Sequence, residues 1–150
     1  MDDLAKDERI EGFRRLCRER GLALTPQRRA ILVAVLDLDD HPTADRVHAA
    51  LARRRVRVSR ATVFRTLESF ARMGIIAKTC HPGSAIRYDR RTDRHHHLVC
   101  LSCDRVIDIS DARLDALPVP DTRPFGFVVS DFKVQLRGIC KECREQEDKT

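Results

Sequence analysis

The residues most able to do chemistry are two cysteine pairs and a run of three histidines. Each pair has the spacing Cys-x-x-Cys, and the histidine run ends three residues before the first pair. The residues are Cys100 and Cys103, Cys140 and Cys143, and His95, His96 and His97. Two such pairs supply the four thiolates of a closed tetrahedral zinc site, so we interpret the cysteines as ligands of structural zinc. A closed site leaves no position for a histidine, and the histidines therefore predict a second metal with another role.

The other cysteines and isolated histidines have simpler interpretations. Cys17 and Cys80 stand outside the pairs and are expected to be ordinary buried or semi-buried thiols. His48 and His81 have no ligand-spaced partner, so we interpret them as structural or solvated.

Length and charge indicate where a partner binds. The 150 residues suit one large or two small domains, and residues 1–90 hold 19 Lys and Arg against 12 Asp and Glu, whereas residues 91–150 hold 10 against 11. The basic first part is the candidate nucleic-acid binder. No run of 18 apolar residues and no apolar signal segment occur, so we expect a soluble cytoplasmic protein without a membrane partner, in which cysteine pairs hold metal more often than disulfides.

The first part of the chain has clear helix boundaries. Four helices are expected: residues 4–20 before Gly21, a second from a Thr25 cap through residue 36, a third from Thr43 to about residue 54, and a fourth from Ser59 to Gly74. Pro26 occupies the first position of the second helix, which favours this start.

The fourth helix has the pattern of a DNA-recognition helix. Val63, Leu67 and Phe70 form an apolar stripe, extended by Phe64 and Ala71, that is expected to pack on the preceding helices. Arg65 and Arg72 fall on the opposite side, flanked by Thr62 and Ser69, and donors of this kind can enter a major groove. Between residues 46 and 78 Glu68 is the single acid among nine basic residues. A solvated basic surface is the alternative interpretation.

Two short extended runs follow, Ile75–Cys80 and Ala85–Tyr88, separated by His81-Pro-Gly-Ser, a sequence typical of a hairpin turn. A helix-turn-helix followed by a hairpin is a winged helix.

In the second part of the chain, the residue pattern changes from one typical of helices to one typical of strands. Residues 97–101 and 105–109 are expected to be strands, residues 127–139 to supply one or two more, and residues 111–117 a short helix at most, because Pro118, Pro120 and Pro124 prevent a longer one. His95 and His97 point to one face of such a strand, while His96 points away and is expected to face solvent or to act as an accessory ligand. We therefore predict an α+β protein: an N-terminal winged helix-turn-helix domain and a small C-terminal α/β domain in which zinc contributes to folding.

With these motifs the chain resembles the ferric uptake regulator (Fur) family of bacterial metal-dependent transcriptional repressors, and most closely its peroxide-stress (PerR) branch. The motifs are Leu24-Thr-Pro-Gln-Arg, His41-Pro-Thr-Ala-Asp, Ser59-Arg-Ala-Thr-Val-Phe-Arg, Arg87-Tyr-Asp, His95-His-His-Leu-Val-Cys-x-x-Cys and Gly138-Ile-Cys-x-x-Cys. The resemblance implies a winged-helix DNA-binding domain over residues 1–88, a hinge at 89–94, and a dimerisation and metal-binding domain over 95–150. It also implies a homodimer on a palindromic operator in double-stranded DNA, and no enzyme activity.

The resemblance further implies a regulatory iron(II) or manganese(II) site. Its ligands would be three imidazoles and two carboxylates: His41, Asp89, His95, His97 and Asp108. Such a mixed nitrogen and oxygen set suits these ions better than thiolate-loving ones. In the peroxide branch, the bound iron reduces hydrogen peroxide, and the oxidant generated attacks a ligand histidine, with His41 and His95 the expected targets. Oxidation then releases the metal and the DNA.

Small differences decide between the branches. Asp108, rather than Glu, and His96, rather than Asp, favour the peroxide branch, whereas an iron-, zinc- or manganese-responsive regulator without peroxide sensing is the main alternative. A non-haem iron enzyme is a remote one, because little chain remains to build a substrate pocket. The residues expected to contact DNA are Arg28, Arg29, Arg60, Thr62, Arg65 and Arg72. Phe64 stands where the family usually has Tyr and lacks its hydroxyl.

Overall fold

The computed structural model describes residues 3–38, 41–79 and 85–147. The chain divides into two compact units, Met1–Thr92 and Asp93–Thr150, and each is described by itself. In the described residues, no helix is both long enough and apolar enough to span a bilayer.

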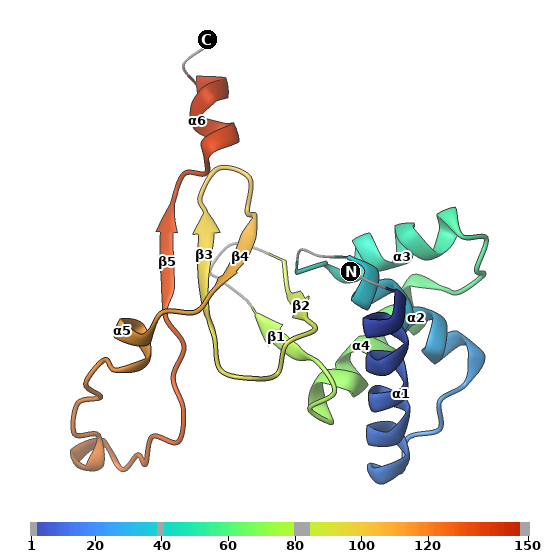
Figure 1. The fold of residues 1–150 in the computed structure, drawn as a ribbon, viewed down its shortest axis with the longest axis horizontal. Helices are drawn as coiled ribbons and strands as arrows, with labels where there is room; N and C mark the ends of the chain where they lie inside the picture. The colour runs from blue at the N-terminus through green and yellow to red at the C-terminus, as the bar shows by residue number, and fades with distance from the viewer. Residues whose placement is uncertain (1–2, 39–40, 80–84, 148–150) are drawn as a thin grey trace. The chain divides into compact units, whose positions relative to one another are not determined.

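The first unit is a bundle of four helices followed by a two-stranded ribbon (Figure 1). Its elements are α1 (Asp3–Glu19), α2 (Pro26–Asp37), α3 (Ala44–Arg53), α4 (Arg60–Arg72), β1 (Ala77–Thr79) and β2 (Arg87–Asp89). The order of the elements and the pairing of the two strands are those of a winged helix. The predicted fold class is confirmed.

Hydroxyl side chains begin three of these helices, as predicted. Thr25 accepts a hydrogen bond from the backbone N–H of Arg28 at 3.3 Å, and Thr43 accepts one from Arg46 at 3.3 Å. Ser59 accepts one from Thr62 at 3.1 Å at the start of α4. Each bond satisfies one of the N–H groups that a helix start leaves without an internal partner.

The core of the first unit fixes which side of α4 faces outward. Val63, Leu67 and Phe70 are fully buried, as predicted, and Thr66 is buried with them. Phe64, predicted to extend the apolar stripe, is instead 46% exposed. The reason is helical geometry, since residue 66 lies three and four positions from Val63 and Phe70, whereas residue 64 is rotated about 100° beyond Val63.

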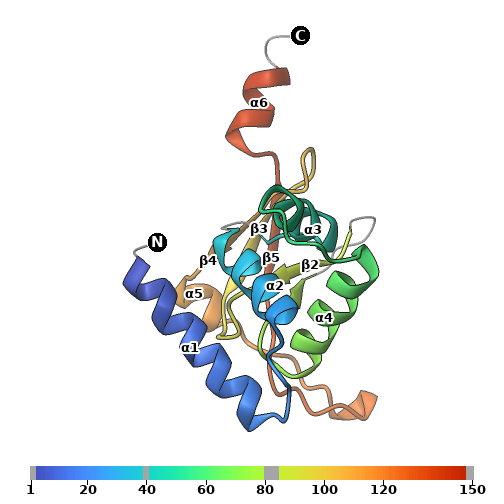
Figure 2. The ribbon, with the colours of Figure 1, turned by 90° about the vertical axis from the view of Figure 1, so that its right-hand side faces the viewer.

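The wing is an antiparallel ribbon. Lys78 of β1 lies opposite Tyr88 of β2, and Ala77 lies opposite Asp89. The predicted turn at 81–84, together with Cys80 and His81, lies outside the described residues. Figure 2 shows β2 beside α4, and a hydrogen bond joins the two elements.

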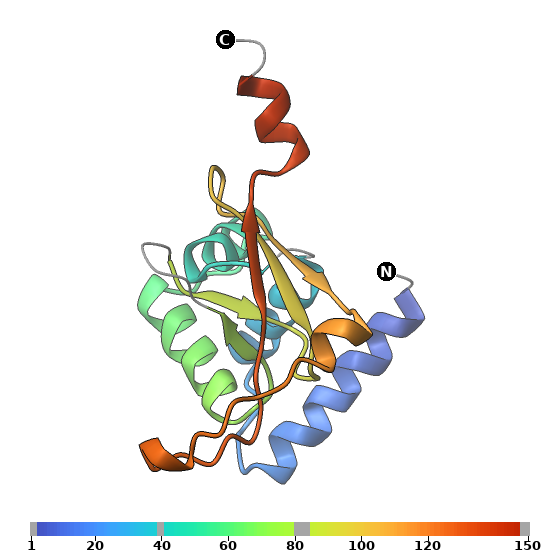
Figure 3. The same ribbon diagram turned by 90° about the vertical axis from the view of Figure 1, so that its left-hand side faces the viewer.

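The second unit is built on a three-stranded sheet of order β4-β3-β5 (Figure 3). Its elements are β3 (His96–Cys100), β4 (Val106–Ile109), α5 (Ala112–Asp115), the 3-10 turn η1 (Arg123–Phe125), β5 (Gln135–Gly138) and α6 (Lys141–Glu147). β3 runs antiparallel to β4 and parallel to β5. The short α5 confirms the prediction of at most a short helix over residues 111–117, before the prolines. Of the one or two strands predicted within residues 127–139, one forms. Helix α6 was not predicted.

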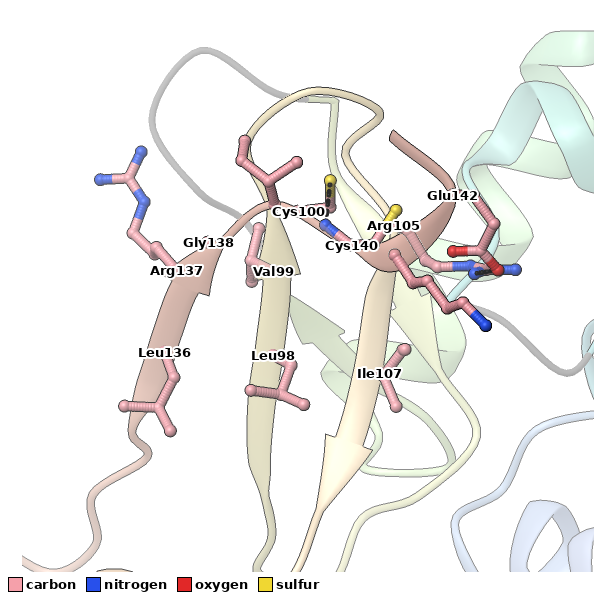
Figure 4. Close-up of a pocket in the computed structure, with 12 residues that line it drawn as sticks. Leu98, Val99, Cys100, Arg105, Ile107, Leu136, Arg137, Gly138, Cys140 and Glu142 are labelled. Atoms are coloured by element: carbon pink, nitrogen blue, oxygen red, sulfur yellow. Dashed lines mark hydrogen bonds and ion pairs between the residues drawn. The ribbon is translucent and has the colours of Figure 1, made fainter. Parts of the chain in front are cut away.

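The two faces of this sheet differ in chemistry. Leu98 lies beside Ile107 on β4 and Leu136 on β5, and all three are between 39% and 46% exposed. They line a shallow depression of about 400 Å³ (Figure 4). His97 and Asp108, paired one position along the ladder, occupy the other face because side chains alternate along a strand.

Candidate metal centres and DNA-facing surface

The second unit brings the four paired cysteines together. Their sulfur atoms all lie within 4.8 Å of one another. Cys100 Sγ lies 3.9 Å from Cys143 Sγ, and Cys103 Sγ lies 3.8 Å from Cys140 Sγ. Four sulfurs about 2.3 Å from a zinc ion are about 3.8 Å apart in a tetrahedron. Two of the sulfur pairs have this spacing, and the cluster therefore fits a closed zinc site.

Strand ends and one turn position these cysteines. Cys100 ends β3, and Cys103 follows in a turn where Asp104 adopts a left-handed φ of 57°. Cys140 and Cys143 lie before and within α6, which continues from the end of the parallel strand β5. Because β3 and β5 run side by side in the same direction, their ends deliver the two pairs to one point.

The thiols differ in acidity. The backbone N–H of Cys140 donates to Cys100 Sγ at 3.3 Å and lowers the pKa of Cys100 to about 6. The N–H of Cys143 lowers the pKa of Cys140, but desolvation and the neighbouring thiols outweigh it and raise that pKa to about 12. Adjacent thiols resist ionising together, so a cation is needed to hold all four as thiolates.

A second group of metal-binding side chains lies on the other face of this sheet. His95 Nε2 and His97 Nε2 lie 3.0 Å apart, and Asp108 Oδ1 lies 3.4 and 3.5 Å from these nitrogens. Both histidines are buried. Two ligand nitrogens about 2.1 Å from one ion and at right angles would be about 3.0 Å apart. These three side chains are therefore spaced to share an ion.

The tautomer of His95 favours metal binding. Its Nδ1 lies 2.7 Å from the backbone oxygen of Asp93, which can only accept, so Nδ1 carries the proton. Nε2 is then left with a lone pair directed toward His97 and Asp108. A second-sphere carbonyl of this kind commonly orients a ligand histidine.

The remaining two predicted ligands belong to the first unit. His41 Nε2 lies 3.3 Å from Asp89 Oδ2, and both residues are buried. Asp89 Oδ1 accepts a hydrogen bond from the N–H of Arg91 at 2.7 Å. The predicted regulatory ligands thus form a pair in the first unit and a triad in the second.

His96 has neither of its predicted roles. It is fully buried, its Nδ1 accepts from the N–H of Val134 at 3.1 Å, and its Nε2 lies 3.1 Å from Asp115 Oδ1. Its ring also stacks on Phe132, over which Arg94 lies. Asp115, Phe132 and Val134 come from the loop region between β4 and β5, whose position no local sequence pattern indicates. His96 therefore anchors that loop.

The predicted DNA-contacting residues lie on or near α4. Arg28, Thr62 and Arg65 line a polar hollow of about 340 Å³ between the start of α2 and α4. Arg65, Arg72 and Arg29 are exposed, but two others already have partners. Arg60 binds Asp45, with Nε 3.0 Å from Oδ1, and Arg28 donates to the backbone oxygen of Ala23 at 2.8 Å.

A winged-helix unit followed by a four-cysteine metal unit defines a class of DNA-binding, metal-containing transcription regulators. Residues 19–137 match the model of the Ferric uptake regulator family, and the chain belongs to that family. A peroxide-responsive repressor PerR of Staphylococcus epidermidis is 31% identical over 140 residues, or 93% of each chain.

Two solved structures are similar to most of this chain. The ferric uptake regulator from Francisella tularensis with iron matches with a TM-score of 0.70 and 25% identity, over 83% of this chain and 96% of that chain. A zinc-bound manganese uptake regulator matches with a TM-score of 0.67 and 31% identity, over 85% and 98%. The relatives thus share the fold of both units but differ in the metal that their names report.

Proposed function

We propose that this chain is a metal-dependent repressor that senses hydrogen peroxide through oxidation of a ligand histidine. The observation that carries the proposal is the convergence of His95, His97 and Asp108 around one point. The peroxide-responsive name of the Staphylococcus epidermidis relative supports it. The expected setting is a cytoplasmic homodimer on a palindromic operator.

The residues present fit a regulatory iron or manganese ion. These ions prefer imidazole and carboxylate donors to the thiolates of a zinc-type sulfur site. In the proposal, His41 and Asp89 join the triad across a hinge at residues 89–94, so that occupancy favours one arrangement of the two domains. A ligand shifts such an equilibrium only by its differential affinity for the two arrangements.

The four cysteines have a supporting role in this scheme. The zinc bound by Cys100, Cys103, Cys140 and Cys143 would fix the ends of β3 and β5, and β3 carries His97. The regulatory triad then stays formed while the domains move. Zinc is inert to redox change, which suits a scaffold beside a redox sensor.

DNA recognition is assigned to α4 and its surroundings. Arg65, Thr62 and Arg72 are proposed to read the major groove, while Arg28, Arg29 and Arg60 bind phosphates. Arg60 can bridge Asp45 and a phosphate because its guanidinium has five N–H donors.

Iron bound at the regulatory site would activate hydrogen peroxide next to the ligand imidazoles; overall, one peroxide oxygen would be added to an imidazole carbon and the other would leave as water, with the iron returned to its starting state. His95 is held by Asp93 with its ring in contact with His97, and His41 lies against Asp89. An imidazole that gains an oxygen atom is a poorer ligand. Loss of the ligand then releases the metal and the operator.

The test begins with protein purified without oxygen and loaded with iron(II) or with manganese(II). After hydrogen peroxide treatment, peptide mass spectrometry should find the mass of one added oxygen atom on His41 or His95 in the iron form only. Operator binding should be lost in the iron form and retained in the manganese form. Loss of DNA binding without histidine oxidation would contradict the proposal.

A regulator that responds to iron, zinc or manganese without sensing peroxide is the second candidate. It is supported by the iron-containing and zinc-bound structural relatives. It predicts that each activating ion restores DNA binding and that peroxide leaves the iron form on its operator.

A further inference from the structure

Beside its proposed metal ligand, β2 carries a side chain that reaches the recognition helix. Tyr88 is fully buried, and its hydroxyl donates to Glu68 Oε1 on α4 at 2.8 Å. The second carboxylate oxygen of Glu68 accepts from Lys78 Nζ at 2.9 Å. Tyr88 is adjacent to Asp89, so one strand carries both a proposed ligand and a contact to α4.

The same strand is bound to the segment that contains His41. The N–H of Tyr88 donates to the Pro42 oxygen at 2.9 Å, and Arg87 Nη1 donates to the His41 oxygen at 3.0 Å. Arg87 also forms a β-bridge with Thr43, the cap of α3. The ligand pair His41 and Asp89 therefore sits on one hydrogen-bonded piece of the first unit.

The position of Glu68 on α4 gives this contact a consequence for DNA binding. Glu68 lies three residues after Arg65 and four before Arg72, so the three side chains share one side of the helix. A carboxylate on this side would repel DNA phosphates, but Glu68 is bound by Tyr88 and its charge is offset by the Lys78 ammonium. The buried side of α4 sets its rotation, and the Tyr88–Glu68 bond adds a contact that ties the arginine-bearing side to β2.

We propose that the Tyr88–Glu68 hydrogen bond is a positioning contact that couples metal binding at His41 and Asp89 to the orientation of α4. The inference rests on the proposed metal-dependent DNA binding. Metal occupancy steadies β2 and the 41–43 segment, and Tyr88 transmits that constraint to the recognition helix. Lys78, opposite Tyr88 in the wing, holds the carboxylate in place.

The test measures coupling rather than affinity alone. A labelled duplex is first selected from a random pool by manganese-loaded wild-type protein. Its dissociation constant is then measured with and without manganese(II) for wild type, Tyr88→Phe and Glu68→Gln. We expect Tyr88→Phe to reduce the manganese enhancement of DNA binding about tenfold, the effect of one hydrogen bond to a charged group. The affinity of the metal-free protein should stay within about twofold.

Linkage provides an independent readout. The coupling factor is the ratio by which manganese increases the affinity for the duplex. Because coupling is reciprocal, the duplex should increase the manganese affinity of wild type by the same factor. For Tyr88→Phe, that increase should be about tenfold smaller. Glu68→Gln should also weaken coupling. The loss of coupling free energy in the double variant should be smaller than the sum of the two single losses, because both substitutions remove the same contact. Asp37→Asn, which disturbs the Arg54–Asp37 ion pair elsewhere in the first unit, is the matched control and should keep the wild-type factor.

Each outcome is decisive. If Tyr88→Phe and Glu68→Gln both keep the wild-type coupling factor, or if Asp37→Asn loses it equally, the coupling role is wrong. If wild type itself shows no manganese-dependent binding, or the selection recovers no sequence, the proposed function fails instead.

Discussion

At the scale of single residues, the candidate site combines two kinds of donor that serve different ends. The cysteines form a closed sulfur cluster, whereas His95, His97 and Asp108 form an open set of nitrogen and oxygen atoms. Sulfur favours zinc and excludes hard ions, while the open set can complete its coordination with further ligands. Donor chemistry alone therefore distinguishes the two candidate metal sites.

The arginines on and before α4 lead to a prediction at the same scale. Arg65 is exposed and lines the hollow beside α2, whereas Arg60 is bound to Asp45. We expect Arg65→Ala to weaken binding of the selected duplex by about 1–3 kcal/mol and to relax the base preference. Arg60→Ala should instead weaken binding to all sequences equally and reduce the salt dependence by about one phosphate contact.

Fluorescence anisotropy at several salt concentrations, with the selected duplex and its single-base variants, separates these effects. Arg60→Ala is the matched control for Arg65→Ala, since both remove one positive charge from α4. An Arg65→Ala protein with unchanged affinity and unchanged base preference would show that α4 does not read bases through this residue.

At the scale of elements, the boundaries of the helices were the most predictable feature. Thr25, Thr43 and Ser59 cap their helices as expected, because capping depends on residues only three positions apart. The wing strands and the zinc-type cysteine cluster also follow from local spacing. These features together placed most of the candidate ligands on the correct elements.

The features that could not be predicted depend on distant contacts. His96 is buried because the loop from 115 to 134 folds over it. The alternation of side chains along this short strand does not indicate that contact. Helix α6 is composed mainly of good helix formers, with Glu142 in its first turn, but seven residues are too few to give a clear period. Tyr88 and Glu68 meet across twenty positions of sequence.

The end of α4 supports a prediction about stability. Gly74 has a φ of +70°, and a Cβ there would meet Arg20 no closer than 3.8 Å. Gly74→Ala should therefore lower the free energy of unfolding by about 1 kcal/mol through backbone strain rather than a clash. Gly12, inside α1 with no atom within 4 Å of its added Cβ, is the control.

Gly12→Ala should raise the stability of the chain, by about 0.5–1 kcal/mol, because alanine favours a helix interior. Urea unfolding followed by circular dichroism measures both variants. Equal effects of the same sign at the two glycines would contradict the argument from backbone conformation.

At the scale of the whole molecule, the two units differ in the size of their apolar cores. The first has a large apolar core that includes Leu32, Leu67 and Phe70, whereas the sheet of the second leaves Leu98, Ile107 and Leu136 partly exposed. Small units with thin cores need a metal to fold. Removal of zinc should therefore unfold the second unit and leave the helices of the first.

A strong chelator at neutral pH, followed by hydrogen exchange across the chain, measures this difference. Protons compete with zinc for thiolates, so zinc affinity and the stability it supplies are present at neutral pH and fall as the pH is lowered. Adding zinc back should restore protection in residues 93–147. Uniform loss of protection in both units would show that they fold as one.

The parallel arrangement of β3 and β5 has a mechanical consequence. Both strands end at the cysteine cluster, so a tension applied to the two ends of the second unit would pass from β3 through the metal into α6. The 36 residues between Cys103 and Cys140, which include β4, η1 and β5, lie outside this load path. The bypassed segment would therefore bear no force until the metal–sulfur bonds break. Its release would then lengthen the chain by about 130 Å, at about 3.5 Å for each residue.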